Sequence, residues 1–96
     1  MDERVKRVLI ESLADPSEKV RYEAATALAQ ENDPSALHEL TSILADTTSK
    51  KRKIAAMFLG SMIQKGNTDA IDILLAYAKD PDDDVRAAVI DALGNA

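Results

Sequence analysis

Two segments of the chain share one pattern that decides its fold: DPSEKVRYEAATALA at residues 15–29 and DPDDDVRAAVIDALG at residues 80–94. Both carry Asp, Pro, Val, Arg, Ala and Leu in the same register. A third segment, DTTSKKRKIAAMFLG at residues 46–60, keeps the arginine, the final leucine and the closing glycine of that register. The aspartates that begin the three segments are 31 and 34 residues apart, which is the period of a helix–turn–helix repeat.

Aspartate–proline pairs indicate where helices begin, because every proline of the chain follows an aspartate. An aspartate carboxylate accepts hydrogen bonds from the free amides of a first helical turn, and proline needs no amide partner there. Thr48 is a candidate cap for a further helix, and Gly66-Asn67 indicates a helix end followed by a new start. The sequence predicts six helices, at about residues 3–14, 17–30, 35–45, 49–64, 68–79 and 82–94.

The predicted helices alternate in direction, since links of two to four residues force neighbours to run antiparallel. A leucine lies six residues before each leading aspartate, which extends the register upstream to Leu9, Leu40 and Leu74. We therefore expect three stacked hairpins with Leu40 in the core between them. Their boundaries fall at about residues 1–31, 32–65 and 66–96 of a single domain.

The composition fits one small folded domain. The chain has 96 residues, 46% of them apolar and 30% charged, with a net charge of −5. Cysteine is absent, which excludes disulfides, thiolate catalysis and cysteine-based metal sites. The chain starts with charged residues, unlike a signal peptide, and no apolar run approaches the roughly 20 residues that span a bilayer. We expect a cytoplasmic protein.

The repeated pattern Asp-Pro-x-x-x-Val-Arg-x-x-Ala/Val-x-x-Ala-Leu-Ala/Gly resembles the short HEAT repeat of phycobilin lyase subunits and many microbial scaffolding proteins. The resemblance covers nearly the whole chain and implies an all-α, armadillo-like solenoid of three HEAT-like hairpins in a right-handed superhelical stack. The second repeat departs from the pattern, with Thr47 for proline and Lys51 for valine. Because this repeat serves many unrelated functions, the resemblance says more about fold than about function.

Each repeat carries an arginine six residues after its leading aspartate. In HEAT-like repeats such residues commonly form a ladder along the interior turns, so the resemblance implies a structural and not a catalytic row. The pairs are Asp15 with Arg21, Asp46 with Arg52, and Asp80 with Arg86.

No catalytic or metal-binding constellation stands out. HEAT-like proteins resembling deoxyhypusine hydroxylase hold two iron ions with His-Glu pairs at the start of second helices, whereas the lone His38-Glu39 pair lies on a first helix. The matching positions carry other residues, namely Tyr22-Glu23, Lys53-Ile54 and Ala87-Ala88. One histidine does not build a two-metal site, and no serine lies in a nucleophile elbow. We expect no metal, no cofactor and no enzymatic activity.

The basic run Lys50-Lys51-Arg52-Lys53 is the candidate for contact with nucleic acid. The acidic turn Asp82-Asp83-Asp84 holds the equivalent place one repeat further on, so stacking brings the two runs together. Pairing between hairpins, or a solvated face, accounts for the run better than nucleic-acid binding, which the negative net charge also disfavours.

Candidate partner contacts lie on the second helices, which line the concave binding face in HEAT-like solenoids. Every fourth residue along these helices gives Tyr22, Thr26, Lys53 and Met57. Tyr22 and Met57 are the candidate anchors, because an amphipathic ring and an adaptable thioether suit exposed recognition sites. A position in the core is the alternative for Met57.

The C-terminal end is a second candidate surface. Ile90 stands where the other repeats have Ala25 and Ala56, and it extends an apolar arc. The arc indicates an association surface or the place of a further repeat, and a single exposed apolar residue is the alternative. The first helix has a broad charged side and is expected to close the other end. We predict a non-enzymatic interaction module that binds a protein partner, or itself, through one of these surfaces. The alternative is a partner-dependent enzyme subunit resembling a bilin lyase component.

Overall fold

Six α-helices follow one another along the chain in the computed structural model, which describes all 96 residues. They are α1 (Glu3–Ser12), α2 (Glu18–Gln30), α3 (Leu37–Ala45), α4 (Arg52–Gln64), α5 (Thr68–Leu75) and α6 (Asp83–Leu93), with a short 3₁₀-helix, η1 (Pro34–Ala36), before α3. No strand is present. The predicted all-α solenoid is confirmed. None of the helices has both the length and the apolar character needed to cross a bilayer.

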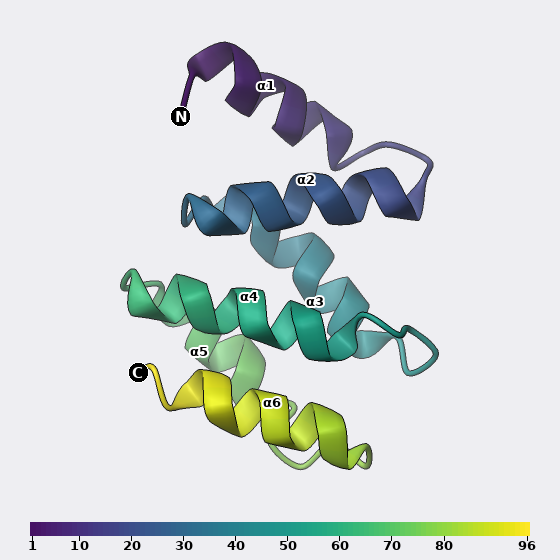
Figure 1. The fold of residues 1–96 in the computed structure, drawn as a ribbon, viewed down its shortest axis with the longest axis vertical. Helices are drawn as coiled ribbons and strands as arrows, with labels where there is room; N and C mark the ends of the chain where they lie inside the picture. The colour runs from purple at the N-terminus through teal and green to yellow at the C-terminus, as the bar shows by residue number, and fades with distance from the viewer.

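The helices stack in two layers along the longest axis of the molecule (Figure 1). The second helices of the hairpins, α2, α4 and α6, lie one beneath another, and α3 and α5 lie behind them. The Cα atoms extend 38 × 29 × 14 Å, so the stack is a thin slab with two broad faces. We call the broad face formed by the second helices the α2–α4–α6 face.

The core runs between the layers and follows the repeat register. Leu40 and Leu74 are fully buried, as the register predicts, while Leu9 at the equivalent position is only half-buried. The difference arises because α1 is the end helix and contains no buried residue. The largest fully buried side chains are Leu28, Leu40, Leu44, Leu59, Met62, Leu74 and Val89.

Small residues bring α4 and α6 close together. A Cβ atom placed on Gly60 would lie 2.8 Å from the Cβ atom of Ala92 and 3.0 Å from its Cα atom, so the two backbones touch at this point. The Asn95 side chain adds a bond by donating to the Gly60 carbonyl at 3.2 Å. This contact fixes the third hairpin against the second.

Two helices differ from their predicted bounds: α5 ends at Leu75 and not at about residue 79, and α4 begins at Arg52 and not at about residue 49. The Asp46 carboxylate accepts from the amide and hydroxyl of Thr48, and Ser49 accepts from the Lys51 amide, so these residues form turns. The first turn of α4 has no acid and no side-chain cap, which leaves the positive helix end uncompensated. The helix α4 therefore begins six residues after its leading aspartate, whereas α2 and α6 begin three residues after theirs.

Candidate functional site

Arg52 joins the second and third hairpins. Its Nε atom donates to the Leu44 carbonyl at 2.7 Å, and its two terminal nitrogens donate to the Asp80 carboxylate at 3.1 and 2.5 Å. The two side chains are only 6% and 8% exposed. The Arg52 guanidinium lowers the pKa of Asp80 below its usual value, and the same bond raises the pKa of Arg52. Both groups therefore stay charged inside the interface.

The other two arginines of the row bind differently. Arg21 donates to the Asp15 carbonyl at 2.8 Å and forms an ion pair with Glu39 of the next hairpin at 3.2 Å. Arg86 donates to the carbonyls of Asp80 and Pro81 and has no carboxylate partner. The predicted carboxylate pairs within one repeat are wrong, because the carboxylate partners of Arg21 and Arg52 come from the following hairpin. A structural role for the row remains a prediction.

The basic run and the acidic turn line one shallow hollow at the start of α4 and α6. Arg52 alone among the four cations forms an ion pair, and the Lys51 ammonium lies 4.1 Å from the centre of the Tyr22 ring. The two runs are therefore neighbours, as predicted. No residue of the acidic turn forms an ion pair with the basic run, and Arg52 pairs instead with Asp80, which precedes that turn. Lys50 and Lys53 are exposed. That nucleic-acid binding is weak remains a prediction.

The four predicted contacts on the second helices have different exposures. Lys53 is exposed, and Met57 is 58% exposed, which places it outside the core. Tyr22 is half-buried beneath Lys51, and this burial raises the pKa of its hydroxyl. The prediction that Thr26 lies on the surface is wrong, because Thr26 is 7% exposed and its hydroxyl donates to the Glu23 carbonyl. The exposed centre of the α2–α4–α6 face is thus on α4.

Met57 belongs to a small apolar centre on α4. Ile54 lies one turn before it and is 38% exposed, and Lys53 is adjacent. The equivalent positions on the flanking helices carry acids: Glu23 on α2 matches Ile54, and Asp91 on α6 matches Met57. Both acids are exposed. The face therefore presents an apolar centre between acidic neighbours.

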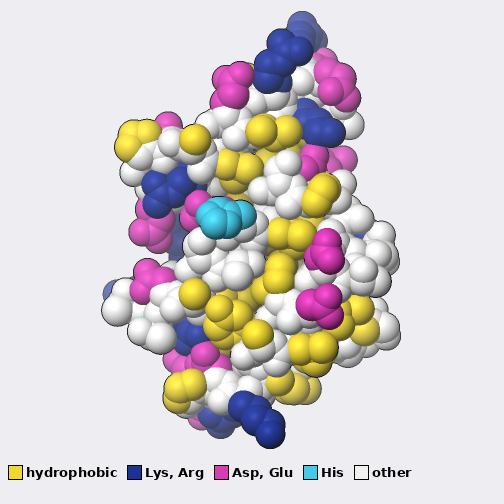
Figure 2. Space-filling model, turned by 180° about the vertical axis from the view of Figure 1, so that it is seen from behind, with side chains coloured by type: hydrophobic (Ala, Val, Ile, Leu, Met, Phe, Trp, Pro, Cys, Tyr) yellow, Lys and Arg dark blue, Asp and Glu magenta, His cyan; other side chains and the backbone are white.

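His38 lies on α3, in the other layer. Figure 2 shows its ring, in cyan, open to solvent on the face opposite the second helices. His-Glu pairs of the hydroxylase-like kind would begin at one position on each of α2, α4 and α6. In this chain these positions carry Tyr22, Lys53 and Ala87. The donor set of this chain does not fit a metal site built from His-Glu pairs.

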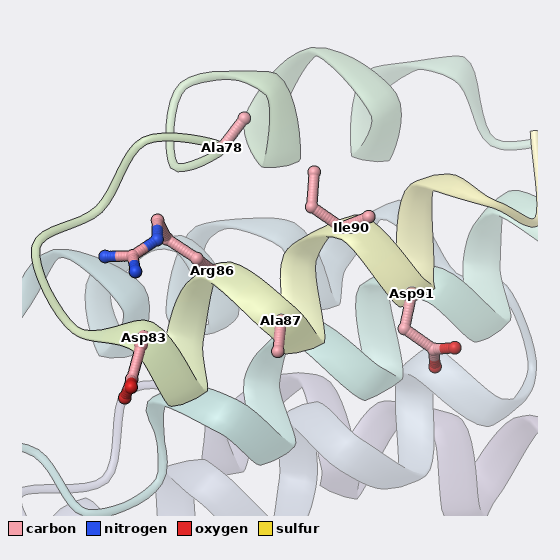
Figure 3. A pocket seen from close by; sticks show the side chains of 6 residues that line it. All are labelled: Ala78, Asp83, Arg86, Ala87, Ile90 and Asp91. Atoms are coloured by element: carbon pink, nitrogen blue, oxygen red, sulfur yellow. The ribbon is translucent and has the colours of Figure 1, made fainter.

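Apolar side chains are exposed at both ends of the stack. Ile90 is 58% exposed at the C-terminal end. It lines a shallow hollow together with Arg86 on the same helix and Ala78, which follows α5 (Figure 3). The expectation that charged residues close the first helix is wrong, because Val5 and Val8 on α1 are 50% and 59% exposed. The predicted open flank therefore has a counterpart at the N-terminal end.

Residues 6–94 match the family of HEAT repeats, and the chain belongs to this family. It is also similar to a curated protein, deoxyhypusine hydroxylase of Drosophila pseudoobscura pseudoobscura, with 41% identity over 69 residues. The match covers 70% of this chain and 22% of the relative, so the chain spans about a fifth of that protein's length. The match is to HEAT repeats in general, and the phycobilin lyase type remains a prediction.

The similarity corrects one prediction made from the sequence. We expected the protein to have no enzymatic role, yet the relative that matches most of this chain is named as a hydroxylase. The single histidine and the absence of cysteine limit only the chemistry that this chain's own residues can perform. They did not bear on the rest of the relative, of which this chain matches 22%.

Proposed function

We propose that the protein takes part in an enzyme reaction of the deoxyhypusine hydroxylase kind, and that its α2–α4–α6 face holds the protein substrate. The match to that hydroxylase supports the enzyme context, and membership of the HEAT family supports a surface for protein binding. The protein is then not a scaffold without enzymatic role, as the sequence led us to expect. It is instead part of an enzyme, as in the alternative prediction, with a hydroxylase in place of a bilin lyase.

The observation that carries the proposal is the exposure of Met57 at the middle of the face. An exposed thioether at the centre of a surface, with Ile54 beside it, forms an apolar contact site that costs little to desolvate when a partner binds. Glu23 and Asp91 supply negative charge on either side. Such a surface fits a protein segment with an apolar side chain flanked by basic residues.

The proposal predicts that Met57→Glu weakens binding of a deoxyhypusine-containing protein at least about tenfold, because an apolar contact is replaced by a charge. Isothermal titration of the purified chain with that protein measures the affinity. Leu75→Glu is a matched control, since Leu75 is 57% exposed but lies on α5 in the other layer.

Retained affinity in Met57→Glu, or an equal loss in both variants, would contradict the assignment to this face. No binding by the wild-type chain would contradict the proposed substrate itself. Circular dichroism of both variants establishes that any loss arises from the surface and not from unfolding.

A further inference from the structure

Two methionines of α4 differ completely in their access to solvent. Met62 is fully buried in the core, whereas Met57 is 58% exposed at the middle of the α2–α4–α6 face. The third methionine of the chain, Met1, precedes α1 and is not on that face. Because an oxidant has to reach the sulfur of a thioether to react with it, the fold leaves Met57 open to oxidation and protects Met62.

The surroundings of Met57 suit both oxidation states of its sulfur. Ile54, one turn before it, is 38% exposed and supplies an apolar neighbour to the thioether. Lys53, four residues before it, is exposed and forms no ion pair. Residues four apart are neighbours on a helix surface, and a sulfoxide oxygen accepts hydrogen bonds. The Lys53 ammonium is therefore a donor for an oxygen atom added to this sulfur.

We propose that Met57 is a site of reversible oxidation by hydrogen peroxide, and that its sulfoxide weakens binding of the protein substrate to the α2–α4–α6 face. The sulfur lone pair attacks one peroxide oxygen and the O–O bond breaks. The proton on the transferred oxygen passes to the departing hydroxide, which leaves as water. The thioether is oxidised to a sulfoxide and the peroxide is reduced. The effect on binding rests on the proposed function, whereas the oxidation does not.

The change alters the binding surface and leaves the core intact. Met57 lies outside the buried cluster, so its oxidation removes no core contact. A sulfoxide is polar, however, and packing it against an apolar side chain of a partner costs the hydrogen bonds that it makes with water. Methionine sulfoxide reductases reverse the change, because two thiols supply the electrons and protons and the oxygen leaves as water.

Peptide mass spectrometry tests the modification site. The folded chain is treated with hydrogen peroxide for increasing times and cut after Lys53 and Lys65, which gives one peptide that contains both methionines of α4. Fragment ions then locate the added oxygen. Met57 should be oxidised at least about tenfold faster than Met62 in the folded chain, and at a similar rate in urea. Equal rates in the folded chain would overturn the assignment.

Isothermal titration with a deoxyhypusine-containing protein tests the effect on binding. The oxidised wild-type chain should bind at least about fivefold more weakly than the untreated chain, and treatment with sulfoxide reductases of both stereochemical types should restore the affinity. Met57→Leu is the matched control, since it keeps Met1 but has no thioether on the face. Peroxide treatment should not change the affinity of this variant.

Unchanged affinity of the wild-type chain after oxidation of Met57 would overturn the effect on binding. An equal loss in peroxide-treated Met57→Leu would also overturn it, because the loss would then arise elsewhere. No binding by the untreated chain would contradict the proposed function and the effect on binding together, while the oxidation rates would still decide the modification site. Circular dichroism before and after treatment establishes that the chain remains folded.

Discussion

At the residue scale, neighbours decide what each repeated residue does. The arginine of the first repeat is half-buried, Arg52 is buried and Arg86 is exposed, although all three hold the same register position. Arg52 is enclosed because the Leu44 carbonyl and the Asp80 carboxylate satisfy its nitrogens within the stack. Gly60 likewise matters through a contact with the next hairpin, where a side chain has no room.

Gly60→Ala should lower the free energy of unfolding by about 1–3 kcal/mol, because the added methyl group would overlap Ala92 and separate α4 from α6. Denaturant unfolding followed by circular dichroism measures the change. Ser61→Ala, one residue further along the same helix, is the control and should change stability little. A Gly60→Ala protein as stable as the wild type would show that the two helices do not touch at this glycine.

At the element scale, caps and connections set the length of each helix. A residue in the left-handed region lies two residues after the end of both α2 and α4, namely Asn32 at φ 52° and Gly66 at φ 90°. In each case the amides that follow bond back to carbonyls of the last turn, which closes the helix end in the same way. The helices are then held in place by their apolar sides, as the burial of Leu40 on α3 shows.

Leu40→Ala should lower the free energy of unfolding by about 2–5 kcal/mol, because it leaves a cavity among fully buried side chains. Leu75→Ala provides the comparison, since this leucine is 57% exposed and its truncation removes little buried area. Thermal and urea unfolding of the two variants measure the difference. A loss below about half a kcal/mol for Leu40→Ala would contradict the repeat register.

At the scale of the whole molecule, the hairpins are joined by apolar packing and by ion pairs between repeats. The pair of Arg52 and Asp80 connects the second hairpin to the third, and Lys6 with Asp33 connects α1 to the turn before α3 at 3.3 Å. The Lys65 ammonium, at the end of the second hairpin, also donates a hydrogen bond to the Gln30 carbonyl at the end of the first. These bonds fix the stacking register, while burial supplies most of the stability.

Stability should fall as the pH drops below about 4. The bond from Arg52 lowers the pKa of Asp80 below its usual 3.8, so the folded carboxylate binds a proton less readily than the unfolded one. Its contribution is therefore complete above the unfolded pKa and is lost as the pH falls through the folded pKa. Urea unfolding at a series of pH values should show a shallower loss for Asp80→Asn than for the wild type.

Arg52→Lys serves as a control for geometry, because lysine keeps the charge but not the two parallel bonds to the carboxylate. It should be less stable than the wild type near neutral pH and retain part of the acid dependence. An unchanged pH profile in Asp80→Asn would show that this pair does not contribute to stability.

The helices, their hairpin order and the repeat register follow from the sequence alone, because caps, prolines and apolar spacing act over a few residues. Which positions are buried depends instead on how the hairpins pack. Thr26 and Met57 share one register position, yet Thr26 is buried and Met57 is exposed. Val5 and Ala36 also share a position, and Val5 is exposed while Ala36 is buried. Burial depends on neighbouring hairpins, and in a stack only interior hairpins have a neighbour on both sides.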